Sequence, residues 1–172
     1  MSSKLKSKQL TQGLFGIYLI ALFWIIIFKL NLSLIPLGSR RSINLIPFAA
    51  SAAINGHIDW AEPLLNVLVF VPFGLYAANL FKPIGFKVKL IIAVSVFCEV
   101  VQFIFGIGAT DITDVINNTL GGIIGLFVYQ GVKIGVQNSD KMQKVINQIA
   151  VVGTILCVAL LVLVKLGMHL RV

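Results

Sequence analysis

The chain has 172 residues, of which 58% are hydrophobic and only 12% are charged, and its formal net charge is +8. An ordinary soluble domain carries about 25% charged residues, so this chain has too few polar groups to cover a surface in water. The composition argues against a soluble enzyme and a nucleic-acid-binding domain, and it indicates a protein of the lipid bilayer. In such a protein the positive charge is typical of basic cytoplasmic loops that face anionic lipid.

Five apolar segments follow one another along the chain, each close to the roughly 20 residues that a helix needs to cross the hydrocarbon core. They are residues 12–30, 63–81, 88–107, 112–132 and 145–166. The loop of residues 31–62 is long enough to hold a short interfacial or re-entrant piece. We therefore predict an all-α fold: one transmembrane domain over residues 1–172, an integral membrane bundle of about five helices.

The first segment follows a basic stretch, as the apolar part of a signal peptide does. Phe28-Lys29-Leu30 stands where a cleavage site would need small residues, so we expect an uncleaved anchor.

The loops fall into two sets because successive spans alternate in direction. One set carries nine Lys and Arg residues and the other carries five. The richer set consists of Lys4, Lys6, Lys8, Lys82, Lys87, Lys89, Lys133, Lys141 and Lys144. Cytoplasmic loops carry the excess of basic residues, so we expect a cytoplasmic N-terminus, an extracellular C-terminus and an outer loop at residues 31–62.

The cysteines and histidines give no sign of a metal or redox site. Cys98 and Cys157 lie inside apolar runs, where cysteine behaves as a small buried hydrophobic residue. His57 and His169 have no partner at metal-ligand spacing, and no HExxH, CxxC or Gly-rich phosphate motif occurs. We therefore predict no metal and no cofactor.

Glu99 lies inside the third segment, where an ionisable side chain costs at least about 2.5–3.5 kcal/mol on insertion scales. On a helix it shares a face with Ser95, Gln102 and Gly106, within an arc of roughly 60°. This stripe has two explanations. It is either a protonated glutamate that holds helices together, or a carboxylate that binds a ligand or handles a proton, and intramembrane acids favour the second.

A second polar stripe begins the fourth segment. Within an arc of roughly 80° on a helix it contains Asp111, Asp114, Asn118, Gly122 and Gly125. Asp111 or Thr110 suits the N-cap position. Capping explains Asp114 and Asn118 less well, because both lie deeper. Gly121 and Gly125 form a GxxxG step that permits the close approach of another helix. We expect the glycine face of this segment, with Gly122, to contact the helix that carries Glu99.

The second segment contributes Asn66, near the same end of the bundle as the acids. Its amide either lines the same site or makes a plain hydrogen bond between helices. Pro72 removes a backbone donor and is expected to kink the helix. We assign Pro72 and Gly74 to helix packing, together with the three glycines of the fourth segment.

These stripes lead to one prediction about the site. We expect a single polar site that opens outward, with two asparagines at its rim. Its members are Glu99, Gln102, Asp111, Asp114 and Asn118, and the rim residues are Asn66 and Asn44.

Three stretches resemble motifs of the VanZ-like family. They are residues 41–48 (RSINLIPF), residues 66–74 (NVLVFVPFG) and residues 99–122, which run from Glu99 through Gln102 to DITDVINNTLGG. The resemblance covers residues 14–133. Much of the family has an arginine shortly before the first Asp of the third motif, whereas this chain has Gly108 and Ala109 there, so no role of that arginine carries over.

The resemblance implies an integral membrane protein of Gram-positive bacteria that confers low-level resistance to glycopeptide antibiotics, teicoplanin in particular. It does not imply an established mechanism. Three classes of function stay open at this point. The first is a non-enzymatic factor whose acidic site binds the lipoglycopeptide, a peptidoglycan precursor or another membrane lipid.

The second class is an intramembrane enzyme, with Glu99 and Asp114 as general acid and base on a lipid-linked substrate. The third is a transporter or flippase for a lipid or small molecule, with Glu99 as its proton site. The chain has no nucleophile motif and no visible inverted repeat. We therefore favour the first class, which involves no catalysis and no nucleic acid, and the oligomeric state stays open.

Overall fold

The computed structural model describes residues 2–28, 42–47, 60–106 and 109–169. Each predicted apolar segment forms one long helix: α1 (Ser2–Phe28), α2 (Ala61–Leu80), α3 (Ile84–Phe105), α4 (Ile112–Gly135) and α5 (Ser139–His169). All five are long and apolar enough to cross a membrane. The predicted helical membrane bundle is therefore confirmed.

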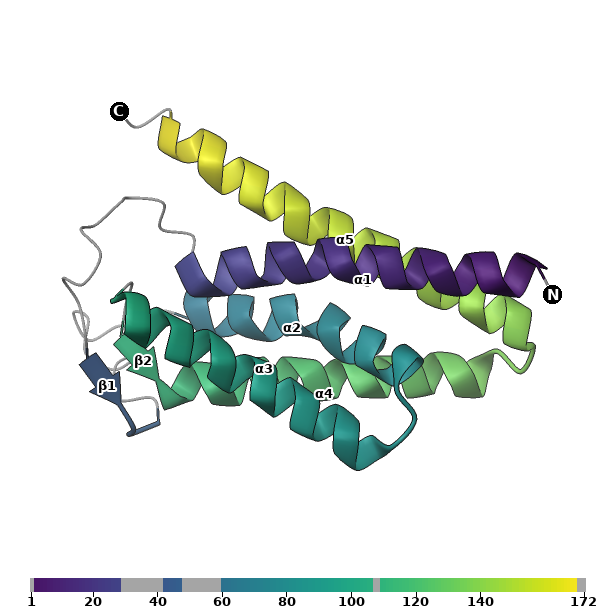
Figure 1. The fold of residues 1–172 in the computed structure, drawn as a ribbon, viewed down its shortest axis with the longest axis horizontal. Coiled ribbons are helices and arrows are strands. Elements are labelled where there is room, and N and C mark those ends of the chain that lie inside the picture. Colours follow the sequence, from purple (N-terminus) through teal and green to yellow (C-terminus); the bar gives the residue numbers. More distant parts are fainter. Residues whose placement is uncertain (1, 29–41, 48–59, 107–108, 170–172) are drawn as a thin grey trace.

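The helices run back and forth, so the connections gather at two ends of the bundle (Figure 1). At one end α1 and α3 finish, and α2 and α4 begin. A small sheet lies there, so we call it the sheet end. The α2–α3 and α4–α5 connections lie at the opposite end, which we call the lysine end because Lys82, Lys133 and Lys141 lie in or beside them.

The sheet consists of two short parallel strands, β1 (Ser42–Asn44) and β2 (Ala109–Asp111). Its register pairs Asn44 with Asp111. The sequence analysis did not expect these strands, because each has only three residues and β1 lies in the long loop that we thought could hold an interfacial piece. The remainder of that loop, at 29–41 and 48–59, lies outside the described residues.

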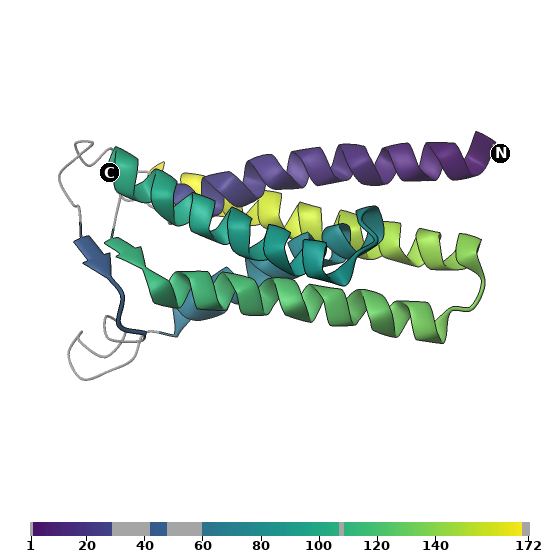
Figure 2. The ribbon, with the colours of Figure 1, turned by 60° about the horizontal axis from the view of Figure 1, so that its bottom comes forward.

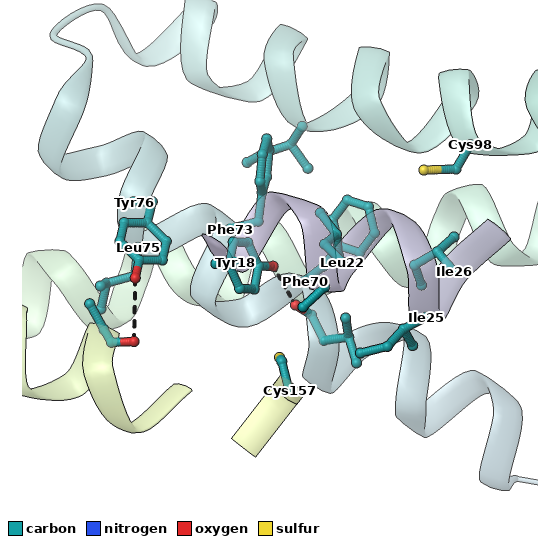
Figure 3. Packing of buried hydrophobic residues seen from close by; sticks show 14 of the residues in the cluster. Tyr18, Leu22, Ile25, Ile26, Phe70, Phe73, Leu75, Tyr76, Cys98 and Cys157 are labelled. Atoms are coloured by element: carbon teal, nitrogen blue, oxygen red, sulfur yellow. Dashed lines mark hydrogen bonds between the residues drawn. The ribbon is translucent and has the colours of Figure 1, made fainter. Parts of the chain in front are cut away.

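Aromatic side chains fill the middle of the bundle (Figure 3). Tyr18, Phe70, Phe73 and Tyr76 are all at least 99% buried. The rings of Phe70 and Phe73 pack edge to face at 5.7 Å, and those of Tyr18 and Tyr76 lie 5.4 Å apart. Aromatic pairs at such distances add to the dispersion energy of the core.

Both tyrosine hydroxyls find partners in this apolar layer. The hydroxyl of Tyr18 donates to the carbonyl of Val69 at 2.6 Å, and that of Tyr76 lies 2.9 Å from the hydroxyl of Thr154 on α5. Val69 belongs to the turn of α2 that Pro72 deprives of a backbone donor. The hydroxyl of Tyr18 thus ties α1 to α2 at the carbonyl next to that of Leu68, which is the one that Pro72 leaves without a helical donor.

Glycines bring α2 and α4 into backbone contact. A Cβ added to Gly121 would collide with the carbonyl of Val67, and one added to Gly125 would collide with the carbonyl of Val71. Our expectation that the glycine face of α4 packs against the Glu99 helix is therefore wrong for Gly121 and Gly125, which both face α2, and it holds for Gly122 alone.

The reason lies in the small residue that α2 carries at the crossing. A Cβ on Gly74 would collide with the carbonyl of Gly122, so glycines from both helices meet and neither backbone is held away. Gly122 alone of this set also faces α3, where an added Cβ would come within 2.5 Å of Ile91. The branched side chain of Ile91 stands between α3 and α4, so α3 lies farther from α4 than α2 does.

Candidate functional site

The predicted site residues lie towards the sheet end of the bundle, where α2 and α4 begin and α3 ends (Figures 1 and 2). Almost all of them are more than nine-tenths buried, and Asn44 is half-buried. The buried members are Asn66, Glu99, Gln102, Asp111, Asp114 and Asn118. Since burial of polar groups is expensive without partners, the hydrogen bonds of each residue decide what it does.

Glu99 holds the strand that leads into α4. One of its carboxylate oxygens, Oε2, accepts a hydrogen bond of 3.0 Å from the backbone N–H of Asp111, and its carbonyl accepts one of 3.3 Å from the hydroxyl of Thr110. The chain can fold back in this way because Gly106 ends α3 with a φ of 61°. This left-handed conformation is cheap for glycine only.

Asp111 joins three segments of the chain. Its Oδ1 accepts a hydrogen bond of 2.8 Å from the backbone N–H of Thr113, which confirms the predicted N-cap of α4. Its Oδ2 accepts one of 3.1 Å from the side-chain amide of Asn44. The carbonyl oxygen of that amide accepts from the backbone N–H of Ile46, also at 3.1 Å, which orients Asn44.

Two further side-chain pairs connect α4 to its neighbours. Asn66 of α2 donates to Oδ1 of Asp114 at 2.8 Å. One turn deeper, Asn118 donates to the hydroxyl of Ser95 on α3 at 3.1 Å. The polar faces of α3 and α4 therefore meet in the interior, with α2 on the other side of α4.

Gln102 turns towards α1. Its amide donates to the carbonyls of Ile26 and Ile27, at 2.9 and 3.3 Å. The last carbonyls of a helix find no N–H donor within the helix. The amide of Gln102 therefore supplies the donor that the end of α1 lacks. No hydrogen bond described for Gln102 reaches the other predicted site residues, and its structural role is to hold the end of α1.

Among the described residues, three amides each have a buried polar atom that makes no hydrogen bond: Gln102 at Oε1, Asn117 at Nδ2 and Asn118 at Oδ1. Such atoms are rare in folded proteins and are typical of places that take water or a polar ligand. All three belong to side chains of the sheet-end half of α3 and α4. The site therefore has unused hydrogen-bonding capacity beside its carboxylates.

The sequence analysis missed Asn117, which is 6% exposed. A signal for it was present, because Asn117 lies three residues after Asp114 and four before Gly121, and this spacing places all three on one side of a helix. It also assigned no contact partner to Ser95 or Thr110, because neighbours on other elements cannot be derived from a helical wheel.

The chemistry of this arrangement is that of hydrogen bonding and charge. Among the described residues, no group of three or more His, Cys, Asp and Glu side chains is placed to hold a metal ion. Glu99, Asp111 and Asp114 supply carboxylate oxygens, and the amides supply both donors and acceptors. Such a set suits a ligand that carries amines, amides or hydroxyls.

The comparisons with known proteins agree with this structure. The VanZ/LLP1 family model matches residues 15–134. Protein VanZ of Enterococcus faecium is 41% identical over 170 residues, which cover 96% of this chain and 97% of that protein. No solved structure matches the chain. With its five apolar helices, the chain is a multi-pass membrane protein and belongs to the VanZ/LLP1 family.

Proposed function

We propose that this protein lowers the sensitivity of a Gram-positive cell to glycopeptide antibiotics, and to teicoplanin in particular, by binding a ligand at the sheet end. Family membership and the 41% identity to the enterococcal protein VanZ support the role in resistance. The mechanism rests on the polar site, which we define as Glu99, Gln102, Asp111, Asp114, Asn117 and Asn118, with Asn44 and Asn66 at its rim.

One observation carries the proposal: three motifs that are far apart in the sequence meet through side-chain hydrogen bonds. Asn44 of the first motif bonds to Asp111 of the third, and Asn66 of the second bonds to Asp114 of the third. A helix bundle does not need carboxylates to pack, because the glycine contact already joins α2 and α4. The polar contacts therefore favour a binding role over a purely structural one.

The ligand that fits this chemistry bears hydrogen-bond donors and reaches the membrane surface. Two ligands meet both conditions: the amine-bearing lipoglycopeptide itself and a lipid-linked cell-wall precursor. Carboxylates in a site of low dielectric bind ammonium and amide donors more strongly than they do in water. Capture of either ligand at the sheet end would reduce the effect of the antibiotic.

The proposal requires the sheet end to face the outside of the cell. The distribution of lysines supports this orientation, since Lys82, Lys87, Lys89, Lys133, Lys141 and Lys144 all lie towards the opposite end. Basic residues are enriched on the cytoplasmic side of membrane proteins. The N-terminus is then cytoplasmic and the C-terminus extracellular.

Cysteine labelling tests the orientation. Leu45→Cys and Thr110→Cys should react with a membrane-impermeant thiol reagent added to intact cells, and Lys141→Cys should react only after the membrane is opened. The native Cys98 and Cys157 are buried and give a low background. Reaction at positions 45 and 110 only from the cytoplasmic side would move the polar site to the wrong leaflet and contradict the proposal.

Drug susceptibility tests the function. A teicoplanin-sensitive host should be protected by the wild type and should lose that protection with Glu99→Ala, at equal protein level and with vancomycin measured in parallel. Asp140→Ala is the matched control, because it removes an exposed carboxylate at the lysine end and should keep full protection. Full protection by Glu99→Ala would contradict the proposal.

Two further assays separate the proposal from the other classes of function. Conversion of a lipid-linked substrate by the purified protein would identify an enzyme, and movement of lipid across proteoliposomes would identify a flippase. Binding of teicoplanin or a precursor without either activity is the expected result.

A further inference from the structure

The outward face of α3 carries a groove of about 500 Å³ that the polar site does not use. Among the described residues it is lined by Lys89, Ile92, Ala93, Val96, Phe97 and Val100. These side chains fall within an arc of roughly 140° on the helix, and its large apolar members, Ile92, Val96, Phe97 and Val100, are all more than 40% exposed. The groove therefore faces lipid.

The described lining of the groove belongs to α3 alone, and α1 diverges from α3 towards the lysine end. Figures 1 and 2 both show the two helices close together at the sheet end and farther apart towards the start of α3. Their last aromatic contact in that direction is between Phe23 and Phe97, whose rings meet edge to face at 5.8 Å. The lining of the groove extends along α3 on both sides of Phe97, from Lys89 to Val100.

Lys89 is the only charged residue among the described lining residues. It is exposed on the lipid-facing side of α3 and lies about 8 Å inside the apolar span that begins at Ile84. A charge at this depth is tolerated when the ammonium reaches the headgroup level or pairs with an anion. Lys89 is the lining residue nearest the lysine end, so its ammonium marks the polar end of the groove.

The length of the groove fits one acyl chain. From Lys89 to Val100 the helix rises about 16 Å, which is half of the roughly 30 Å hydrocarbon core. Ala93 has the smallest side chain of the lining, one turn beyond Lys89, and it leaves the hollow where the first methylenes of an acyl chain would lie.

We propose that this groove binds one anionic phospholipid, with an acyl chain along Ala93, Val96 and Val100 and the phosphate on the ammonium of Lys89. Lys82 is exposed near the same end and raises the positive potential there. A zwitterionic lipid carries its own ammonium and gains less from this field. One lysine near the surface favours an anionic lipid about fivefold. The proposal does not depend on the function of the polar site.

Native mass spectrometry of the purified full chain tests the proposal. The protein is mixed with phosphatidylglycerol and phosphatidylcholine of identical acyl chains, and the retained lipids are counted. We expect one retained phosphatidylglycerol with a preference of about fivefold. Lys89→Gln should remove the preference, Lys89→Arg should keep it, and Ala93→Phe should displace the lipid by filling the groove.

Two exposed positions outside the groove serve as matched controls. Lys133→Gln removes a lysine at the same end of the bundle, and Ala159→Phe enlarges an alanine on the surface of α5. Both should leave the retained lipid unchanged. Equal retention of the two lipids by the wild type would overturn the proposal. An equal loss of preference with Lys133→Gln and Lys89→Gln would also overturn it, because the lipid would then respond to general basic charge.

Discussion

Two buried polar regions lie in opposite halves of the bundle, and they are built differently. In the half towards the lysine end, Thr11 of α1 donates to Asn147 of α5 at 2.6 Å, and Gln143 donates to both residues at 3.1 Å. We call these three residues the α1–α5 clasp. Towards the sheet end lies the polar site, which combines three carboxylates with amides.

The clasp contains neutral groups only, and none of its buried side-chain polar atoms lacks a partner among the described residues. The polar site contains ionisable groups and leaves atoms of Gln102, Asn117 and Asn118 unpaired there. A completed neutral network is sufficient to dock two helices in lipid. Ionisable groups with spare hydrogen-bonding capacity are expensive for docking alone, and this difference points to function at the sheet end.

The glycine contact between α2 and α4 lies outside both polar regions, and a glycine variant there should have the largest effect on stability. Gly125→Leu should lower the free energy of unfolding by about 3 kcal/mol or more, because the new side chain collides with the backbone of α2 at Val71. Unfolding in detergent, followed by helical circular dichroism, measures the change.

Gly131→Leu is the control, since nothing lies within 4 Å of the Cβ that it would add. It should change stability by less than about 0.5 kcal/mol. Equal stability of the two variants would show that α2 and α4 do not meet through glycines.

An Asn→Leu substitution in each polar region tests whether the two regions differ in their role. Asn118→Leu and Asn147→Leu each leave buried partners unpaired, so each should cost about 1–3 kcal/mol of unfolding free energy. Only Asn118→Leu should abolish protection against teicoplanin at matched protein level. Loss of protection with both variants, in proportion to stability, would mean that the two regions play the same structural role.

The smallest change in the free energy of unfolding is expected for a substitution within the α1–α5 clasp. Thr11→Val removes the hydrogen bond that Thr11 donates to Asn147 and the one that it accepts from Gln143, while Gln143 and Asn147 stay bonded to each other, so that neither is left without a partner. The free energy of unfolding should therefore fall by only about 0.5–1.5 kcal/mol, with unchanged protection. A loss as large as that of Asn147→Leu would show that Gln143 does not serve as the second donor.

Helical periodicity was sufficient to predict the five spans and the two polar stripes. It placed Asp111 at the N-cap and Glu99 in the interior because both inferences depend on neighbours within a few residues. It could not say which helix a stripe faces. Gly121 and Gly125 of α4 were assigned to α3 although they face α2, and the decisive residue, Gly74 of α2, lies far away in the sequence.

Contacts of long sequence separation were also beyond prediction. The pairing of β1 with β2 joins strands of three residues, too short for any periodic signal. The hydrogen bond from Gln102 to the end of α1 spans 76 residues, and the bond between Thr11 and Asn147 spans 136. Such contacts are fixed by tertiary packing, which a single sequence does not encode in a local pattern.

The central claim is that the acids of the polar site act as one functional unit, and a double-mutant comparison tests it most directly. Teicoplanin susceptibility is measured for cells that express the wild type, Glu99→Ala, Asp114→Ala or both changes at equal protein level. Each single change should abolish protection, and the double variant should be no worse than either, because groups that act together lose their effect together. Full protection by either single variant would contradict the account and leave the acids with a structural role only.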